Sequence, residues 1–195
     1  CALMALHGMN PEETRKIHVG FSAGRFEFMA RPYGIVPRNS LEEEAWPVLR
    51  GKIFSEASEI FLRLLNGEVI SSDMITPTIL ERDNFRSEED WRVIQERAVL
   101  EHGLDVPPDS VEFGNRYVFE QIKTIPQDWN RELLNLVLGS HDKDLQISVN
   151  KFRPVQVFNL SITPPAIIEE THQRMGENYH PDGGIWKRSM MPRTV

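Results

Sequence analysis

The sequence is poor in cysteine, in long apolar runs and in positive charge. Its single cysteine, Cys1, cannot close an internal disulfide, which fits a reducing, cytoplasmic setting. No apolar run reaches membrane-spanning length, and no signal peptide is evident, so we expect no membrane partner. Lys and Arg number 22 against 29 Asp and Glu, for a net charge of −7, which argues against a nucleic-acid partner.

Several motifs of known chemistry are also missing. There is no Walker phosphate loop, and Gly20 and Gly24 lack the spacing of a dinucleotide-binding fingerprint. No cysteine pair exists for zinc. Glu169 and His172 form one i, i+3 pair, whereas a di-iron bundle needs a second copy and two further Glu-bearing helices. The sequence therefore predicts no metal site.

What is present indicates one α/β domain over residues 1–195. With 40% hydrophobic residues the chain can bury a sizeable core. Predicted strands are separated by helices, which favours a parallel sheet. Residues 82–150 are expected to be a mainly helical excursion between two strands. The chain starts without Met in an apolar segment and stops near the start of a further expected strand, so we expect a fragment of a longer protein.

Local signals predict several further elements. The capping box from Ser40 to Glu43 begins a helix, which Pro47 is expected to kink or break. Ser87 begins a second helix that stops at Gly103. Residues 127–138 are interpreted as a helix, and residues 145–152 as a short strand because apolar residues alternate there. On the strand near residue 18, His18 faces away from its apolar neighbours, and a hydrogen-bonded structural histidine is the default interpretation.

The most informative stretch runs from residue 154 to 176. A short apolar strand, Val155 to Phe158, is followed by a polar loop, Asn159 to Thr163, and by a helix that opens at Pro164 and ends at Gly176. A helix N-terminus beside Ser and Thr hydroxyls can bind a phosphate. Pro164-Pro165 removes two N–H donors, so Ser161 and Thr163 would have to supply more of the binding. The simpler alternative is that Thr163 caps an ordinary crossover helix.

Two segments together resemble the bacterial luciferase-like flavin monooxygenases. The first is Arg15-Lys-Ile-His-Val-Gly-Phe-Ser-Ala-Gly24, with the loop to Tyr33-Gly-Ile35 and the Ser40 helix that ends in LLNGE. The second is Pro154-Val-Gln-Val157 followed by Asn159-Leu-Ser-Ile-Thr163. In that family a glycine-bearing strand turn and a later Ser/Thr loop bind the flavin.

The resemblance implies a partial TIM-barrel-like (β/α) fold with the flavin at the carboxyl ends of the strands. A full barrel takes about 250 residues, so this chain would lack the first three strands and the last ones. By resemblance Ser161 binds the flavin phosphate, with Asn159 and Thr163 in the same loop. Ser22 lies near the ring, and Arg25 substitutes for a family arginine whose place Ala23 takes. The catalytic residues would lie on the absent strands and stay unassigned.

The implied activity is that of a flavin-dependent monooxygenase, with the fragment alone expected to be inactive. Reduced FMN from a separate reductase would react with O₂ to oxidise a small organic substrate, and a homo-oligomer is compatible with the family. One alternative keeps the fold but uses a reduced deazaflavin for hydride transfer without oxygen. Another is a non-catalytic α/β interaction module whose 82–150 excursion forms an interface, with Trp91 and Trp129 either as anchors or as core residues.

Overall fold

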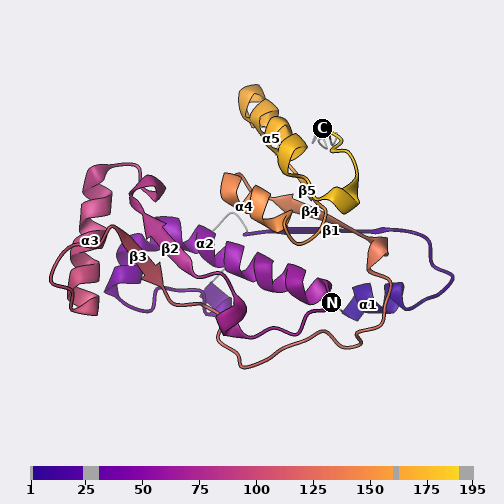
Figure 1. The fold of residues 1–195 in the computed structure, drawn as a ribbon, viewed down its shortest axis with the longest axis horizontal. Helices are drawn as coiled ribbons and strands as arrows, with labels where there is room; N and C mark the ends of the chain where they lie inside the picture. The colour runs from indigo at the N-terminus through magenta and orange to yellow at the C-terminus, as the bar shows by residue number, and fades with distance from the viewer. Residues whose placement is uncertain (1, 24–30, 160–162, 189–195) are drawn as a thin grey trace. The chain divides into compact units, whose positions relative to one another are not determined.

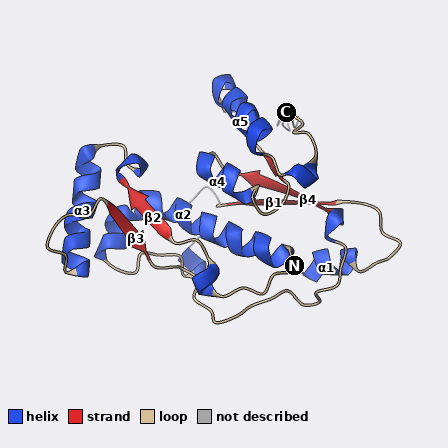
Figure 2. Cartoon of the chain, in the orientation of Figure 1, coloured by secondary structure: helices blue, strands red, loops and turns tan. Residues whose placement is uncertain are grey.

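The computed structural model describes residues 2–23, 31–159 and 163–188 (Figure 1). Its helices and strands are α1 (Ala2–Gly8), β1 (Ile17–Ser22), α2 (Ser40–Leu65), β2 (Thr78–Glu81), α3 (Glu88–His102), β3 (Ser110–Phe113), β4 (Leu134–Gly139), α4 (Lys143–Val149), β5 (Val155–Val157) and α5 (Pro165–Asn178). The chain is therefore mixed α/β, as expected, with both element types in Figure 2. None of the helices in the described ranges has an apolar stretch long enough to cross a bilayer.

The chain divides into two compact units, which are described separately. Unit 1 comprises residues 1–23, 58–71 and 119–195, and unit 2 comprises residues 24–57 and 72–118. Unit 1 contains a three-stranded parallel sheet, and unit 2 contains a two-stranded antiparallel sheet. The strands of the described residues do not form a closed barrel.

The sheet of unit 1 has the order β1-β4-β5, so β4 is the central strand (Figure 1). β1 pairs with β4 along its whole length, from Ile17 opposite Leu134 to Ser22 opposite Gly139. Side chains alternate between the two faces of a strand. One face of β4 is buried, because Leu136 is 2% exposed and Leu138 is fully buried. The opposite face, with Asn135 and Val137, is only half-buried.

Two predictions for this part of the chain are wrong. Residues 127–138, predicted as a helix, contain all but the last residue of the strand β4, and residues 145–152, predicted as a strand, contain most of the helix α4. Asp142 begins α4, since its Oδ1 accepts a hydrogen bond of 3.0 Å from the Leu145 N–H. The stretch 82–150, expected to be mainly helical, thus also contains β3 and the central strand of the sheet.

Asn150 joins the end of α4 to the start of β5. Its side chain is 3% exposed. Its Nδ2 donates to the carbonyls of Gln146 and Val155 at 3.2 and 3.0 Å, and its Oδ1 accepts from the Val155 N–H at 3.1 Å. A further contact of 3.4 Å joins Oδ1 to the His180 N–H. This one amide therefore fixes where β5 begins.

Unit 2 is built around the first half of α2. Its core comprises apolar side chains from α2, α3, β2 and β3, namely Leu41, Ala45, Trp46, Leu49, Ile53, Leu80, Trp91, Ile94, Ala98, Val111 and Phe113. Trp91 is thus a core residue and not an exposed anchor.

A buried carboxylate, Glu42, lies beside this core and is 3% exposed. Its oxygens accept hydrogen bonds from Arg38 Nε at 2.7 Å and from Arg116 Nη2 at 2.8 Å. Burial acts to raise the pKa of Glu42, but the Arg38 hydrogen bonds and the two guanidinium charges outweigh it and lower the pKa below its usual value.

The helix signals of unit 2 are partly confirmed. Ser87 caps α3 by accepting from the Asp90 N–H at 3.1 Å, and Gly103 ends it in the left-handed conformation, as predicted. At α2, Asn39 Oδ1 accepts from the Glu42 N–H at 2.8 Å, so the side-chain cap is one residue earlier than predicted. Pro47 lies inside the continuous helix α2, so the expected break does not occur.

Candidate functional site

The carboxyl ends of the three parallel strands meet at one edge of the unit 1 sheet. Ser22 ends β1 opposite Gly139, which ends β4. The Phe158 N–H donates to the Leu138 carbonyl at 2.8 Å, which places the residues after β5 at the same edge. A Cβ on Gly139 would lie 3.4 Å from the Ser22 Cβ, so glycine leaves space at this position. Ligands of parallel α/β sheets bind at this edge.

Two buried polar atoms at this edge have no hydrogen-bond partner within the described part of the chain. They are Oδ1 of Asn159, which is 3% exposed, and Oγ1 of Thr163, which is 8% exposed. Thr163 therefore does not cap α5, which the simpler interpretation expected. The N-cap residue is Pro164, and it makes no side-chain cap. A buried polar atom without a partner is costly, and a ligand is one explanation for its retention.

Of the other predicted site residues, the structure describes only Ser22. Ser22 is exposed at the end of β1 and belongs to the same edge as Asn159 and Thr163. Arg25 and Ser161 lie outside the described residues. The sheet edge thus brings together three of the five predicted cofactor-binding residues.

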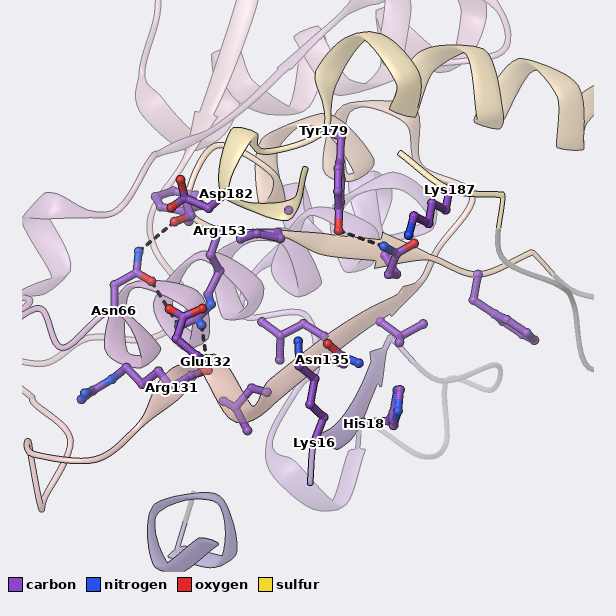
Figure 3. Close-up of a pocket in the computed structure, with 18 of the residues that line it drawn as sticks. Lys16, His18, Asn66, Arg131, Glu132, Asn135, Arg153, Tyr179, Asp182 and Lys187 are labelled. Atoms are coloured by element: carbon purple, nitrogen blue, oxygen red, sulfur yellow. Dashed lines mark hydrogen bonds between the residues drawn. The ribbon is translucent and has the colours of Figure 1, made fainter. Parts of the chain in front are cut away.

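A hollow lies over the half-buried face of the same sheet (Figure 3). It encloses about 870 Å³, within the range of small-molecule sites. Its floor contains His18, Asn135 and Gln156, one from each strand. The His18 ring makes no hydrogen bond to any described residue, and it lines the hollow. The hollow is bordered on the other side by residues that follow α5, including Tyr179 and Lys187.

The lining of this hollow is basic although the chain as a whole is acidic. Five Lys and Arg side chains line it against two carboxylates: Lys16, Arg131, Arg153, Lys187 and Arg188, with Glu132 and Asp182. Arg188 is neutralised by Glu169 at 2.5 Å. The other four cations make no ion pair with any described residue. The lining therefore carries an excess of positive charge over its two carboxylates, and such an excess attracts anions.

Arg131 and Arg153 are held close together at the amino edge of the sheet. Arg153 Nη2 donates to the Arg131 carbonyl at 3.2 Å, and its Nη1 donates to the Leu65 carbonyl at 3.3 Å. Burial lowers the pKa of Arg153, and the charge of Arg131 lowers it further against the opposing effect of Glu132. The Arg131 guanidinium lies 4.6 Å from the centre of the Trp129 ring, and its Nε and Nη2 have no partner in the described ranges.

Aromatic side chains fix the segment that borders the hollow. The Tyr179 hydroxyl accepts a hydrogen bond of 2.8 Å from Gln156 Nε2 in the floor (Figure 3). The Tyr179 ring packs edge-on to Trp186, whose Nε1–H donates to His172 Nδ1 at 3.2 Å. A Cβ on Gly183 would lie 2.3 Å from the Tyr179 ring, so only glycine allows this packing. The segment after α5 is thereby tied both to the sheet and to α5.

His172 and Glu169 are engaged in these contacts. Glu169 pairs with Arg188, and His172 accepts from Trp186. Burial and the charge of Arg188 lower the pKa of His172 below its ordinary value of 6.5, against the opposing effect of Glu169. The neutral imidazole is therefore favoured in the folded chain.

No family model, curated protein or solved structure matches this chain.

The sequence patterns above did not predict the basic hollow, although the positions of its cations along the chain indicate it. Lys16 directly precedes β1, Arg131 lies three residues before β4, and Arg153 lies two residues before β5. Cations just before successive parallel strands share one edge of the sheet. That signal requires β4 to be recognised as a strand, and the helix interpretation of residues 127–138 concealed it.

Proposed function

We propose that this chain is part of a flavin-dependent oxidoreductase of luciferase-like type and that unit 1 binds the FMN phosphate and ribityl chain. The site is the carboxyl edge of the β1-β4-β5 sheet, at the start of α5. The observation that carries the proposal is the pair of buried, unpartnered atoms, Asn159 Oδ1 and Thr163 Oγ1. On this proposal the sheet is one part of a (β/α) barrel.

These two atoms match different parts of the cofactor. A threonine hydroxyl can donate a proton to a phosphate oxygen, and an amide oxygen can accept one from a ribityl hydroxyl. The N-terminus of α5 adds a partial positive charge, although Pro165 has no N–H to contribute. The residues present therefore fit a phosphate ester with a polyhydroxyl chain.

The flavin ring is proposed to lie at the end of β1. Ser22 ends β1, two strands away from Asn159 in the order β1-β4-β5, so roughly 10 Å separates them at about 4.8 Å per strand. That separation suits a cofactor whose phosphate and ring are held at different points. Gly139 lies between them and presents no side chain.

A bound reduced FMN supplies the electrons with which O₂ oxidises a small organic substrate, and a bound deazaflavin would supply hydride without O₂. The protein's own residues hold the phosphate, orient the ring and exclude water. The electrons would come from a separate flavin reductase. Oxygen uptake with reduced FMN and substrate separates the monooxygenase from the deazaflavin enzyme.

The test is an FMN titration followed by flavin fluorescence, with Thr163→Val and Thr163→Ser compared. Valine keeps the shape of threonine but removes the hydroxyl, whereas serine keeps it. We expect Thr163→Val to weaken FMN binding about tenfold or more, from the 1–3 kcal/mol typical of a lost buried hydrogen bond. Thr163→Ser should bind nearly as wild type.

A thermal melt without ligand distinguishes a binding role from a structural one. The Thr163 hydroxyl has no partner among the described residues, so its removal should leave the melting temperature unchanged or raise it. Loss of FMN affinity at unchanged stability supports the proposal. The proposal is contradicted if the wild-type protein melts cooperatively but does not quench FMN fluorescence. It is also contradicted if the valine and serine variants bind FMN with equal affinity.

A further inference from the structure

We propose that the basic hollow binds a small phosphate monoester, with Lys16 and Lys187 as the groups that contact the phosphate. This site is distinct from the sheet edge proposed for FMN, because its cations come from the amino edge of the sheet and from the segment after α5. It requires no assumption about the flavin.

The exposed cations of the hollow that have free donors are ammonium groups, because the unpartnered Nε and Nη2 of Arg131 are buried. Both terminal nitrogens of Arg153 already donate to backbone carbonyls, so this residue contributes charge more than free donors. Lys16 and Lys187 make no ion pair with any described residue, and each ammonium carries three donors. Figure 3 shows Lys16 extending into the hollow beside Asn135, and Lys187 extending into it from the opposite side.

Neutral groups beside the two lysines suit a phosphate ester. The Tyr179 hydroxyl accepts from Gln156 and keeps its own O–H free to donate. Burial raises the pKa of Tyr179 above its ordinary value, against the opposing effect of the Gln156 hydrogen bond, so the hydroxyl stays protonated near neutral pH. Lysine is a common phosphate ligand because its compact charge needs no planar partner.

The hollow has room and apolar surface for an organic group as well. Val137 and Phe158 contribute to its lining, together with Pro154. Inorganic phosphate would leave most of the 870 Å³ filled with water. A monoester with a small apolar or aromatic group would occupy more of it and bury apolar surface, so we expect it to bind more tightly than free phosphate.

The experiment is isothermal titration of the whole chain with phenyl phosphate and, separately, with inorganic phosphate at constant ionic strength. The test variant is Lys16→Gln/Lys187→Gln. The matched control is Lys143→Gln/Lys151→Gln, which changes two exposed lysines of the same unit and gives the same net charge. Thr163→Val reports on the sheet edge. Thermal melts verify that each variant is folded.

We expect saturable binding of one phenyl phosphate, tighter than that of inorganic phosphate. The Lys16→Gln/Lys187→Gln variant should lose about tenfold or more in affinity, and the control variant and Thr163→Val should lose little. Equal affinity for phosphate and phenyl phosphate overturns the monoester assignment. Equal losses in the two double variants, or no saturable binding, overturn the site. A loss in Thr163→Val alone would place the phosphate at the sheet edge, which overturns this proposal and supports the FMN site.

Discussion

Replacement of Asn150 by alanine is expected to detach the start of β5 from α4. Asn150 makes three hydrogen bonds of 3.0–3.2 Å to the backbone of Gln146 and Val155, and its side chain is 3% exposed. β5 is an edge strand that pairs only with β4 within the described residues, so few other groups can replace Asn150 at its start. The Val155 N–H would lose its acceptor while Val155 itself is fully buried.

The size of the effect follows from these contacts. Three hydrogen bonds at roughly 1 kcal/mol each give about 3 kcal/mol, and the stranded Val155 N–H adds about 1 kcal/mol. The expected decrease in the free energy of unfolding is therefore about 3–4 kcal/mol. Domains are typically stable by about 5–15 kcal/mol, so the variant should unfold at a much lower urea concentration.

Urea unfolding followed by circular dichroism measures the decrease, and Asn178→Ala is the matched control. Asn178 makes a single side-chain hydrogen bond of 2.9 Å, to the Arg174 carbonyl within α5, and is half-buried. Its replacement should cost less than about 1 kcal/mol. Hydrogen exchange of the Val155 amide gives a local measurement, and we expect faster exchange in Asn150→Ala than in Asn178→Ala.

The reasoning would be refuted if the two alanine variants unfolded at the same urea concentration. It would also be refuted if the Val155 amide of Asn150→Ala kept its wild-type protection. Either result would mean that pairing with β4 alone fixes β5.

Two further predictions concern unit 2 and the segment after α5. Arg116→Met should lower the free energy of unfolding by about 2–3 kcal/mol, because it leaves the buried Glu42 carboxylate with one of its two arginine partners. The control is Arg92→Met, which removes an exposed ion pair and should leave the free energy of unfolding unchanged in the same urea titration. The pKa of His172 is lowered in the folded chain. The contribution of neutral His172 to stability is therefore fully present above pH 6.5 and is lost as the pH falls through the lower folded pKa. Below that pKa the protonated Nδ1 can no longer accept the hydrogen bond from Trp186. Tryptophan fluorescence should report this change on acidification, and its persistence in His172→Gln would show that another group titrates.

Local sequence patterns predicted the elements whose ends are marked by side chains. Ser87 and Gly103 bound α3 because a hydroxyl cap and a left-handed glycine act within one turn of the helix. The apolar run before Pro164 and the helix after it were predicted for the same reason, since proline restricts its neighbours whatever the rest of the fold does. The grouping of Ser22, Asn159 and Thr163 came from the resemblance to the luciferase-like flavin monooxygenases and not from a local pattern.

The sequence by itself determined the α/β class, the α3 and α5 helices, the β1 and β5 strands, and a polar loop before α5. Only the tertiary structure decided that residues 134–139 are a strand, because hydrogen bonds to β1 on one side and β5 on the other outweigh a local pattern compatible with a helix. It also decided the basic hollow. Lys16, Arg153 and Lys187 are far apart in the chain, and their charges meet because parallel strands align their amino ends and the segment after α5 folds back over the sheet.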